Sequence, residues 1–511
     1  MKQLQARERA RRESSFLRVC LFLTGACSLV LEVLGTRLIS PYYGSSLYTW
    51  SALITVTLVA LAAGYHWGGR LADRTPALTL AARLLSAAAL STALTPLLRA
   101  PVLRGTAGLG VELGAVVSAA ALVAPALVLL SALGPLAVRL LADSVAVVGR
   151  STGVIYGLST LGSVLGAALA GFVLVPHLPL SQILYGMAVL LLLLSAWAHH
   201  LSQRRVPLAQ PAMAAAVALF GFWPRPVPDT NIVLNEESAY GQIKVLDFND
   251  RRYLLVNGTT QSMALLPTLR SDSQYAQTME LAAASRPKAK RALVIGLGAG
   301  LMAGTLQRDY GLTVDAVEID PAMVDAAERF FAYKPNGDVF VEDGRRFLER
   351  ADRRYDLIFL DAFGGEAPPF HLFTEEAFRA MRDRLTPDGL VAINLVSAVH
   401  GDAGKAWRSA DLTLRSVFPE VAAYEASDPV EDLANVVFFA GGGSLPRSVP
   451  AAAPAHIRKN AELALSRPLA AAGASADLLT DDFAPMEALL AETSVRWRRN
   501  LQKKVSEILL Y

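Results

Sequence analysis

The stretch RALVIGLGAGLMAGTLQRDYGLTVDAVEID, residues 291–320, decides the fold class of the second half of this chain. An apolar run ends in a glycine-rich turn, a helix is expected from about residue 301, and a second apolar run ends in an acidic residue. The same alternation continues through the apolar runs at 338–344, 355–363 and 389–396. This order predicts a doubly wound parallel sheet, whose ligands bind beyond the carboxyl ends of the strands.

The residues expected at these strand ends predict a nucleoside site. The glycine turn would let the backbone approach a ligand closely. The acid that ends the second strand is placed to accept hydrogen bonds from the two hydroxyls of a ribose. The acid that ends the third strand could receive an adenine amino group or cap the following helix, and both roles can coexist. The candidate ligands are Gly296, Gly298, Gly300, Glu318, Asp343 and Gly344.

Asp361 ends the fourth strand, within FLDAFGGEAPPFHL at residues 359–372. An enzyme that moves an alkyl group from a sulfonium needs a nucleophile, such as an amine, held in line and stripped of its proton. A carboxylate at this position could orient the amine and accept that proton. It could equally cap a loop, and its position leaves both roles open.

Composition divides the chain into two unlike parts. Hydrophobic residues make up 53% of the 511 residues and the mean hydropathy is +0.36, too apolar for an ordinary soluble enzyme. The apolar residues lie mostly before about residue 224, and the proline-rich WPRPVPD at 223–229 reads as a linker. The net charge of only +3, from scattered basic residues, argues against a nucleic-acid partner.

The first part reads as a multi-pass membrane domain. The expected spans are about 17–38, 46–66, 77–98, 111–141, 152–174 and 178–198, with a kink or tilt in the fourth at Pro125 and Pro135. Residues 208–223 are a borderline seventh span or an interfacial helix. Twelve Lys and Arg residues before the first span and in the loops on that side, against three in the other loops, place the N-terminus in the cytoplasm.

Charged residues lie near the ends of several apolar runs, namely Glu32, Arg37, Arg83 and Glu112. They could form part of a cation path, but pairing or snorkelling at the interface is the favoured interpretation. The glycine pairs 153/157 and 162/166 predict close helix packing. Cys20 and Cys27 lie too far apart on one helical face to bridge each other, and no Cys/His cluster with metal-ligand spacing occurs in the sequence.

After the linker, GQIKVLDF at 241–248 and RRYLLVNG at 251–258 alternate in polarity and predict a β-hairpin before the sheet. The fold class is therefore an α-helical membrane domain followed by a Rossmann-like α/β domain with a small β-hairpin region. The expected segments are a basic N-terminus (1–18), a transmembrane domain (19–223), a linker (224–231), a small β domain (232–290), the α/β domain (291–495) and a basic tail (496–511).

Taken in order, these residues resemble the spermidine synthase (polyamine aminopropyltransferase) family, whose fold is a class I methyltransferase-like sheet preceded by a small β domain. The resemblance covers about 232 to 492 and is carried by YGQIKVLD, VNGTTQS, VIGLGAG, VEIDPAMV, EDGRRFL, LDAF and LTDDFAPME. The first part, with LEVLGTRLISPYYGSSLYTW and GGRLADR, looks like the membrane domain fused to that enzyme in some bacterial members.

The resemblance implies a role for each matching residue. Glu318 would hold the ribose of decarboxylated S-adenosylmethionine, Asp343 and Gly344 would meet the adenine, and Asp361 would handle the attacking amine. Gln242 would join the nucleoside site, and weaker candidates on the acceptor side are Gln261, Tyr275, Glu366, Asp481 and Asp482. The nucleoside is a co-substrate, so neither a tightly bound cofactor nor a metal is expected.

The chain departs from the family on the acceptor side. The family usually has an aspartate where this chain has Ala299, and a second aspartate three residues after Asp361, where this chain has Gly364. In the family a glutamine usually follows the tyrosine of the first β-strand. This chain has Gly241 at that position, and its glutamine, Gln242, comes one residue later. Removing acids weakens the physical case for a cationic polyamine acceptor more than the case for the nucleoside.

Three functions follow. The first is a membrane-anchored aminopropyltransferase that makes a polyamine and releases methylthioadenosine. The second is another S-adenosylmethionine-dependent transferase, such as a methyltransferase, and the third is a transport or sensing protein with a nucleoside-binding domain. We expect an inner-membrane protein whose α/β domain is cytoplasmic, with amine and nucleoside substrates and the lipid bilayer as partners. The resemblance also implies a homo-oligomer. The acceptor and the purpose of the membrane domain stay open.

Overall fold

The computed structural model describes residues 2–44, 47–75, 77–141, 148–203, 206–222, 231–363, 367–427, 432–470, 475–491, 493, 494 and 496. The chain divides into two compact units, a helical unit from Met1 to Pro226 and an α/β unit from Val227 to Tyr511. The division falls inside the predicted proline-rich linker. Most of that linker, and all but the first residue of the predicted C-terminal tail, lie outside the described residues.

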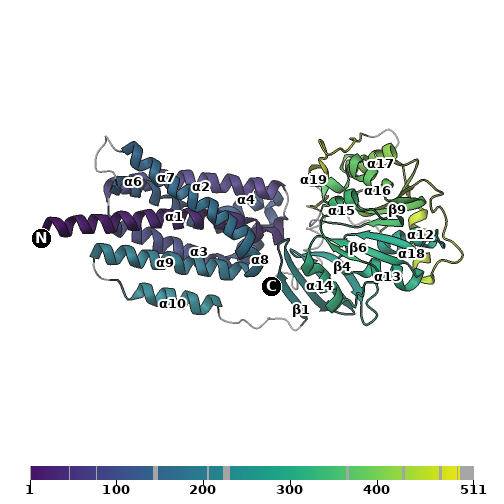
Figure 1. Cartoon of the computed structure of the whole chain (residues 1–511), viewed down its shortest axis with the longest axis horizontal. Helices are drawn as coiled ribbons and strands as arrows, with labels where there is room; N and C mark the ends of the chain where they lie inside the picture. Colours follow the sequence, from purple (N-terminus) through teal and green to yellow (C-terminus); the bar gives the residue numbers. More distant parts are fainter. Residues whose placement is uncertain are drawn as a thin grey trace. The chain divides into compact units, whose positions relative to one another are not determined.

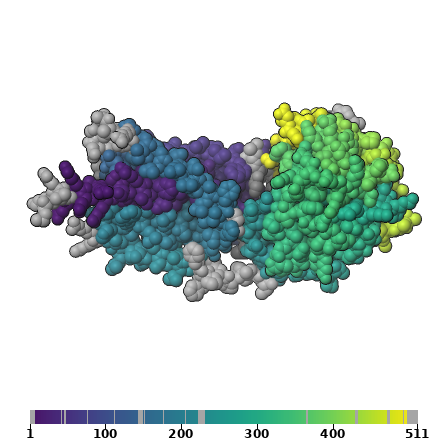
Figure 2. Space-filling model, in the orientation of Figure 1, coloured from purple at the N-terminus to yellow at the C-terminus, as the bar shows by residue number. Residues whose placement is uncertain are grey.

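The helical unit is a bundle (Figure 1). The amino-terminal turns of α1, purple in Figure 2, extend beyond the other helices and are exposed. The helices described are α1 (Lys2–Tyr43), α2 (Leu47–Arg74), α3 (Leu78–Thr106), α4 (Val111–Leu122), α5 (Ala124–Ser131), α6 (Leu133–Leu141), α7 (Val148–Leu169), α8 (Val175–His177), α9 (Leu180–Gln203) and α10 (Ala209–Phe222).

Within the described ranges, six helices are long and apolar enough to cross a membrane. Five are the single predicted spans, and the sixth lies within the predicted 111–141 segment, which is broken into α4, α5 and α6. The break at Val123 is followed by Pro125 in the first turn of α5, as expected for a proline that cannot continue a helix ladder. The α10 helix has only 14 residues, about 21 Å at a rise of about 1.5 Å per residue, too short for a hydrocarbon core of about 30 Å.

Close helix packing occurs at one of the two predicted glycine pairs. A Cβ at Gly162 would lie 1.9 Å from the Phe22 carbonyl oxygen, and one at Gly166 would lie 2.5 Å from the Ala26 carbonyl oxygen, so α7 and α1 touch through their backbones. The prediction was wrong for Gly153 and Gly157, where no described atom lies within 4 Å of an added Cβ. Both cysteines are free and buried, as expected.

Arg99 supports a structural role for a charge at a helix end. Its guanidinium donates to the carbonyl oxygens of Leu38, at 2.9 Å, and Arg37, at 3.1 Å. These two hydrogen bonds attach Arg99 of α3 to the last turns of α1 through backbone acceptors.

The α/β unit opens with a four-stranded antiparallel sheet in the order β1–β2–β3–β4. The predicted hairpin is the β2–β3 pair, and Asn249 in its turn has a φ of 55°, which suits a tight hairpin turn. The strands are β1 (Ile232–Glu237), β2 (Gln242–Phe248), β3 (Arg251–Val256) and β4 (Thr259–Leu265).

The main sheet has the order β12–β10–β11–β9–β8–β5–β6–β7. The five strands from β9 to β7 are parallel, and the three at the other edge are antiparallel. Its strands are β5 (Arg291–Ile295), β6 (Thr313–Glu318), β7 (Val339–Val341), β8 (Tyr355–Leu360), β9 (Leu385–Ala398), β10 (Glu420–Glu425), β11 (Leu433–Gly441) and β12 (Pro468–Leu469). The predicted Rossmann-like class is confirmed.

Two helices of this unit begin after residues whose side chains cap them. Asp320 accepts a hydrogen bond from the Ala322 amide at the start of α14, and Thr374 accepts one from the Ala377 amide at the start of α16. The helices of this unit are α11 (Gln274–Met279), α12 (Leu281–Ala284), α13 (Leu301–Tyr310), α14 (Pro321–Phe330), α15 (Gly344–Arg350), α16 (Glu375–Asp383), α17 (Lys405–Val417), α18 (Ala455–Leu465) and α19 (Met486–Leu489).

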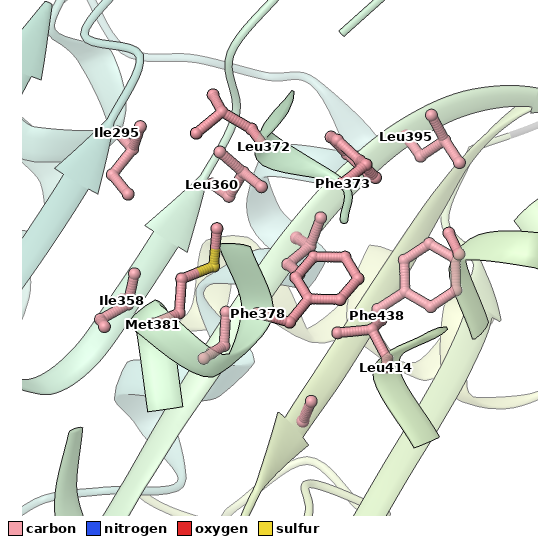
Figure 3. Packing of buried hydrophobic residues seen from close by; sticks show 14 of the residues in the cluster. Ile295, Ile358, Leu360, Leu372, Phe373, Phe378, Met381, Leu395, Leu414 and Phe438 are labelled. Atoms are coloured by element: carbon pink, nitrogen blue, oxygen red, sulfur yellow. The ribbon is translucent and has the colours of Figure 1, made fainter. Parts of the chain in front are cut away.

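The hydrophobic core lies between these helices and the sheet. Phe378 and Met381 of α16 pack with Ile358 and Leu360 of β8, and Leu414 of α17 packs with Phe438 of β11 in the same cluster (Figure 3). All six side chains are fully buried. Burying a side chain of this size stabilises the fold by about 1.5–3 kcal/mol, so the sheet is a stiff base for whatever stands at its strand ends.

Candidate active site

The glycine turn joins β5 to α13 and lies close to the end of β8. Gly296, Gly298 and Gly300 have φ values of 88°, 55° and 71°, a region that side chains disfavour. A Cβ at Gly296 would lie 2.4 Å from the Asp361 carbonyl oxygen, and one at Gly300 would lie 2.6 Å from the Tyr333 ring. The glycines therefore allow a tight turn and let two strand ends approach each other.

Glu318 ends β6 and is held by the glycine turn. One carboxylate oxygen accepts from the amides of Leu297, at 3.0 Å, and Gly298, at 3.4 Å, and the other accepts from the Asp320 amide at 3.1 Å. Burial raises the pKa of Glu318, although these three amides oppose the shift. The oxygens are thus fixed in place, and because three of about four acceptor sites are taken by amides, Oε1 retains one site for a ribose hydroxyl.

Asp343 follows β7 and has the capping role foreseen for it, while its contact with an adenine stays a prediction. One oxygen caps α15 by accepting from the Arg346 amide at 3.0 Å, and the other lies 2.8 Å from Nε2 of His371. Burial would raise the pKa of Asp343, but the hydrogen bonds from Arg346 and His371 outweigh it and hold the pKa below its usual value. Asp343 is therefore an ionised, half-buried acceptor. His371 was not predicted from the sequence.

Asp361 stands at the end of β8, joined to two other elements. Its Oδ1 accepts a hydrogen bond from Nδ2 of Asn394 on β9 at 2.9 Å, and the hydroxyl of Tyr275 on α11 donates to the same carboxylate. Burial raises the pKa of Asp361, and both hydrogen bonds act against this shift. Burial and the nearby Asp361 charge raise the pKa of Tyr275 far above its usual value, so Tyr275 stays a donor.

Two asparagine side chains on neighbouring strands form a hydrogen-bonded chain that ends at Asp361. Asn435 on β11 donates to Oδ1 of Asn394 at 3.0 Å, which leaves the Asn394 amide group directed at Asp361. Both asparagines are buried, with exposed fractions of 2% and 9%. Their positions were missed by sequence reasoning, although a lone amide inside each of the apolar strands VAINLV and LANVVFFAG was an available signal.

The small sheet covers the glycine turn from one side. Ser262 on β4 accepts a hydrogen bond from the Ala299 amide at 3.2 Å. Gln261 lies beside it in a β-bulge, since the register shifts between Leu254 and Leu255 of the partner strand. Bulges re-aim side chains, so Gln261 stays a candidate on the acceptor side.

Gln242 begins β2, and its amide donates to Oδ1 of Asn257 at 3.0 Å. The preceding turn is tied to the end of β6, because the Ser238 hydroxyl donates to Asp320 at 2.5 Å. The small sheet is thereby attached on the Glu318 side of the glycine turn. Gln242 itself makes its described contact through the main chain.

Ala299 is fully buried in an apolar cluster with Ile243, Val245 and Leu254 of the small sheet. Position 299, where the family usually has an aspartate, therefore offers no carboxylate to an acceptor amine. Gly364 and Glu366 lie outside the described residues.

Asp481 is hydrogen-bonded to residues at the starts of two helices. It accepts hydrogen bonds from Thr374, at 2.7 Å, and Arg345, at 3.2 Å, and so anchors the LTDDFAP loop to the starts of α15 and α16. Asp482 is exposed beside it. The idea that Asp481 replaces a missing family acid is not supported by these contacts.

Exposed apolar side chains lie next to the two nucleoside acids. Ile319 directly follows Glu318 and is 40% exposed, Val341 ends β7 and is 51% exposed, and Phe370 beside His371 is 45% exposed. Such side chains suit the flat faces of a purine. Among the described residues no group of three or more His, Cys, Asp or Glu could hold a metal ion.

Residues 274–427 match the family described as Spermine/spermidine synthase domain. The chain is 28% identical over 292 residues to a probable polyamine aminopropyl transferase of Bifidobacterium longum, which covers 53% of this chain and 64% of that protein. It is also 35% identical over 157 residues to an N-terminal histidine N-methyltransferase of Emericella nidulans, covering 29% of this chain and 27% of that protein.

Among solved structures, a probable spermidine synthase from Corynebacterium glutamicum is similar, with a TM-score of 0.38 and 20% identity over 46% of this chain and 87% of that one. The family match over residues 274–427 confirms the sequence resemblance for the segment that contains Glu318, Asp343 and Asp361. The chain spans less than two thirds of the length of the two relatives.

Proposed function

We propose that this chain is a membrane-anchored aminopropyltransferase. It would transfer an aminopropyl group from decarboxylated S-adenosylmethionine to putrescine or a related amine and release methylthioadenosine. The match of residues 274–427 to the spermine/spermidine synthase domain supports the reaction class. The Bifidobacterium relative, by its name a polyamine aminopropyl transferase, supports it further.

One observation carries the proposal: three acids stand at the ends of strands in the order that the donor requires. Strands β8, β5, β6 and β7 are neighbours, and they end near Asp361, the glycine turn, Glu318 and Asp343 in that order. Neighbouring strands lie about 4.8 Å apart, so the acids at the two ends are separated by about 14 Å. An adenosine lying from Asp343 to the glycine turn would place its 5′ sulfonium group toward Asp361.

Asp361 has the properties of the group that receives the proton. The amine nitrogen attacks the carbon bonded to the sulfonium, the C–S bond breaks with its electron pair going to sulfur, and a neutral thioether leaves. The nitrogen must lose one proton, which the Asp361 carboxylate accepts and passes to solvent. Because burial raises the pKa of Asp361, this carboxylate is a better base than an exposed aspartate.

The reaction is tested with the purified full-length chain in two mixtures. The first contains decarboxylated S-adenosylmethionine and putrescine, and the second contains S-adenosylmethionine and a cell extract. Release of methylthioadenosine in the first mixture alone is expected. Release of S-adenosylhomocysteine in the second mixture alone would overturn aminopropyl transfer.

Replacing Asp361 tests the catalytic role. Asp361→Asn keeps the size of the side chain but removes the base, so turnover should fall about 100-fold or more. Binding of methylthioadenosine, measured by calorimetry, should be unchanged because Glu318 and Asp343 are intact.

Asp356→Asn is the matched control on the same strand. Asp356 accepts from the amides of Lys290 and Arg291 at the opposite end of β8, at 2.8 and 3.1 Å, and should leave turnover unaltered. Full activity of Asp361→Asn would exclude the assigned role.

A second candidate is an S-adenosylmethionine-dependent transferase with a different acceptor. The buried, apolar Ala299 favours it, since a di- or tricationic acceptor benefits from more acids than Asp361. The similarity to an N-methyltransferase over 157 residues supports the same alternative. The second mixture above distinguishes the two.

We further propose that the helical unit holds the enzyme in the inner membrane, with the α/β unit in the cytoplasm where the nucleoside donor is made. The six helices of suitable length support this placement.

A further inference from the structure

Glu32 is a carboxylate inside the apolar part of α1, where charge is costly. It lies between Arg18 and Arg37 and is half-buried. Among the residues that the structure describes, no hydrogen bond or ion pair reaches it. A carboxylate in this position needs either a proton or a cation nearby.

Two buried threonine hydroxyls, one on α1 and one on α2, also lack partners among the described residues. Thr36, one turn along α1 on the same face, is 7% exposed, and Thr57 of α2 is 2% exposed. Neither hydroxyl oxygen has a hydrogen-bond partner in the described part of the chain. Other buried threonines of the bundle do bond to the carbonyl four residues before them, as Thr24 and Thr92 do at 2.8 Å. The hydroxyls of Thr36 and Thr57 are therefore left unused by the helices.

The contact between α1 and α2 places these groups at one depth. A Cβ at Gly35 would lie 2.5 Å from Leu53, so the two helices touch there. They are antiparallel, as expected for consecutive helices with a short connection. Thr57, four residues beyond Leu53, is thus level with residues 31 and 32. At about 1.5 Å per residue, Glu32 and Thr57 differ little in depth.

The same level contains the break between α4 and α5. Added Cβ atoms at Gly64 and Gly68 of α2 would lie 2.3 Å from the Val128 carbonyl oxygen and 2.6 Å from that of Ala132, so these segments run in parallel. Thr57 lies seven residues before Gly64. In this parallel register it therefore has about the same depth as residue 121, next to Leu122, where α4 ends. Interrupted helices at membrane depth occur where the backbone lines a cavity or a binding site.

The π-helical turn that follows α7 lies at the same depth as Glu32. The contacts of Gly162 with Phe22 and of Gly166 with Ala26 set a parallel register between α7 and α1. In this register Glu32 is level with about residue 172, within the π-helical turn Ala170–Leu174. Single π-turns inside helices are frequent at functional sites.

We propose that Glu32, Thr36 and Thr57 form an intramembrane site for one monovalent cation, either a primary ammonium group or an alkali ion. One carboxylate balances a single positive charge. The three side chains supply the oxygen acceptors that the three N–H groups of an ammonium require, and the same oxygens can ligate an alkali ion. This site lies outside the proposed active site and does not depend on the reaction performed there.

The experiment measures cation binding to the full-length chain in lipid nanodiscs. Radiolabelled methylammonium and radiolabelled sodium are titrated separately at constant ionic strength, with N-methylglucamine as the replacement cation. Saturable binding of one equivalent of either probe is expected, and the probe that binds identifies the ligand class. Saturation by neither probe overturns the proposal.

Variants assign the binding to the three side chains. Glu32→Gln should weaken binding about 100-fold or more because the only charge of the site is lost. Thr57→Val and Thr36→Val should each weaken it about 10-fold, as expected for one hydrogen bond to a charged group. Glu112→Gln is the matched control, since Glu112 is an exposed carboxylate at the start of α4. Equal effects of Glu32→Gln and Glu112→Gln contradict the assignment.

Infrared difference spectroscopy of the unmodified chain keeps the test valid if Glu32→Gln fails to fold. Adding the bound cation should produce a carboxylate band, because a cation holds Glu32 ionised. A spectrum showing only a protonated carboxyl at this site, unchanged by the cation, would overturn the proposal.

Discussion

At the scale of single residues, the environment of Asp361 sets how it would act. Burial raises its pKa, and the hydrogen bonds from Asn394 and Tyr275 lower it. The balance leaves a carboxylate whose pKa lies above that of an exposed aspartate and closer to neutral pH. A carboxylate with a raised pKa is a stronger base than an exposed aspartate.

Removing Asn394 should move the acidic limb of the pH–rate profile. In the proposed reaction the carboxylate form of Asp361 is the active one, so activity should fall as the pH drops below its pKa. Asn394→Leu deletes a hydrogen bond that lowers this pKa, and the limb should therefore shift to higher pH. The measurement is kcat/KM between pH 5 and 9.

Asn336→Leu is the control for this prediction. Asn336 bonds to the main chain of Leu312 and Val314, at the opposite end of β6, and its loss should affect stability without moving the limb. A limb of Asn394→Leu that stays in place, or moves to lower pH, would show that Asn394 does not tune Asp361.

At the scale of elements, α10 is attached to the bundle by a buried polar contact. Nε2 of Gln210 donates to the hydroxyls of Ser195 on α9, at 2.9 Å, and Ser86 on α3, at 3.2 Å. The Tyr185 and Phe220 rings also meet edge to face, with centroids 5.8 Å apart. A helix too short to span the bilayer is therefore docked on the side of two long ones.

Gln210→Leu should loosen α10. Two hydrogen bonds are lost and two serine hydroxyls lose a donor, so the free energy of unfolding should fall by about 1–2 kcal/mol. Faster amide hydrogen exchange in residues 209–222 is expected in nanodiscs. Leu219→Ala is the control, because Leu219 is 65% exposed and makes little packing contribution. Identical exchange in both variants would argue against the docking role of Gln210.

At the scale of the whole molecule, the number of spans decides which side of the membrane holds the α/β unit. If the six helices of sufficient length in the described part of the chain all cross, the chain returns to the side of its N-terminus. The short α10 follows α9, the last of the six long helices, and the predicted linker 224–231 comes after α10 in the sequence.

Reporter fusions after residue 230 test this topology. A fluorescent protein fused there should be bright, and alkaline phosphatase fused there should be inactive, because both would lie in the cytoplasm. The control is a pair of fusions after residue 176, before the last span, where the opposite pattern is expected. Active phosphatase at residue 230 would require a seventh crossing.

Local chemistry was enough to predict the larger features of this protein. Apolar runs of span length, the alternation of strands and helices, and the glycine turn each follow from short-range patterns that the backbone must obey. The acids Glu318, Asp343 and Asp361 were found because a parallel sheet aligns its strand ends, wherever the rest of the chain goes.

The partners of these residues depend on contacts between distant segments. The asparagine pair behind Asp361 joins strands 41 residues apart in sequence, and His371 reaches Asp343 across 28 residues. The split of the fourth span and the level shared by Glu32 and Thr57 follow from how helices pack. No periodicity in the sequence encodes which side chains face each other across such distances, because that depends on the packing of the whole unit.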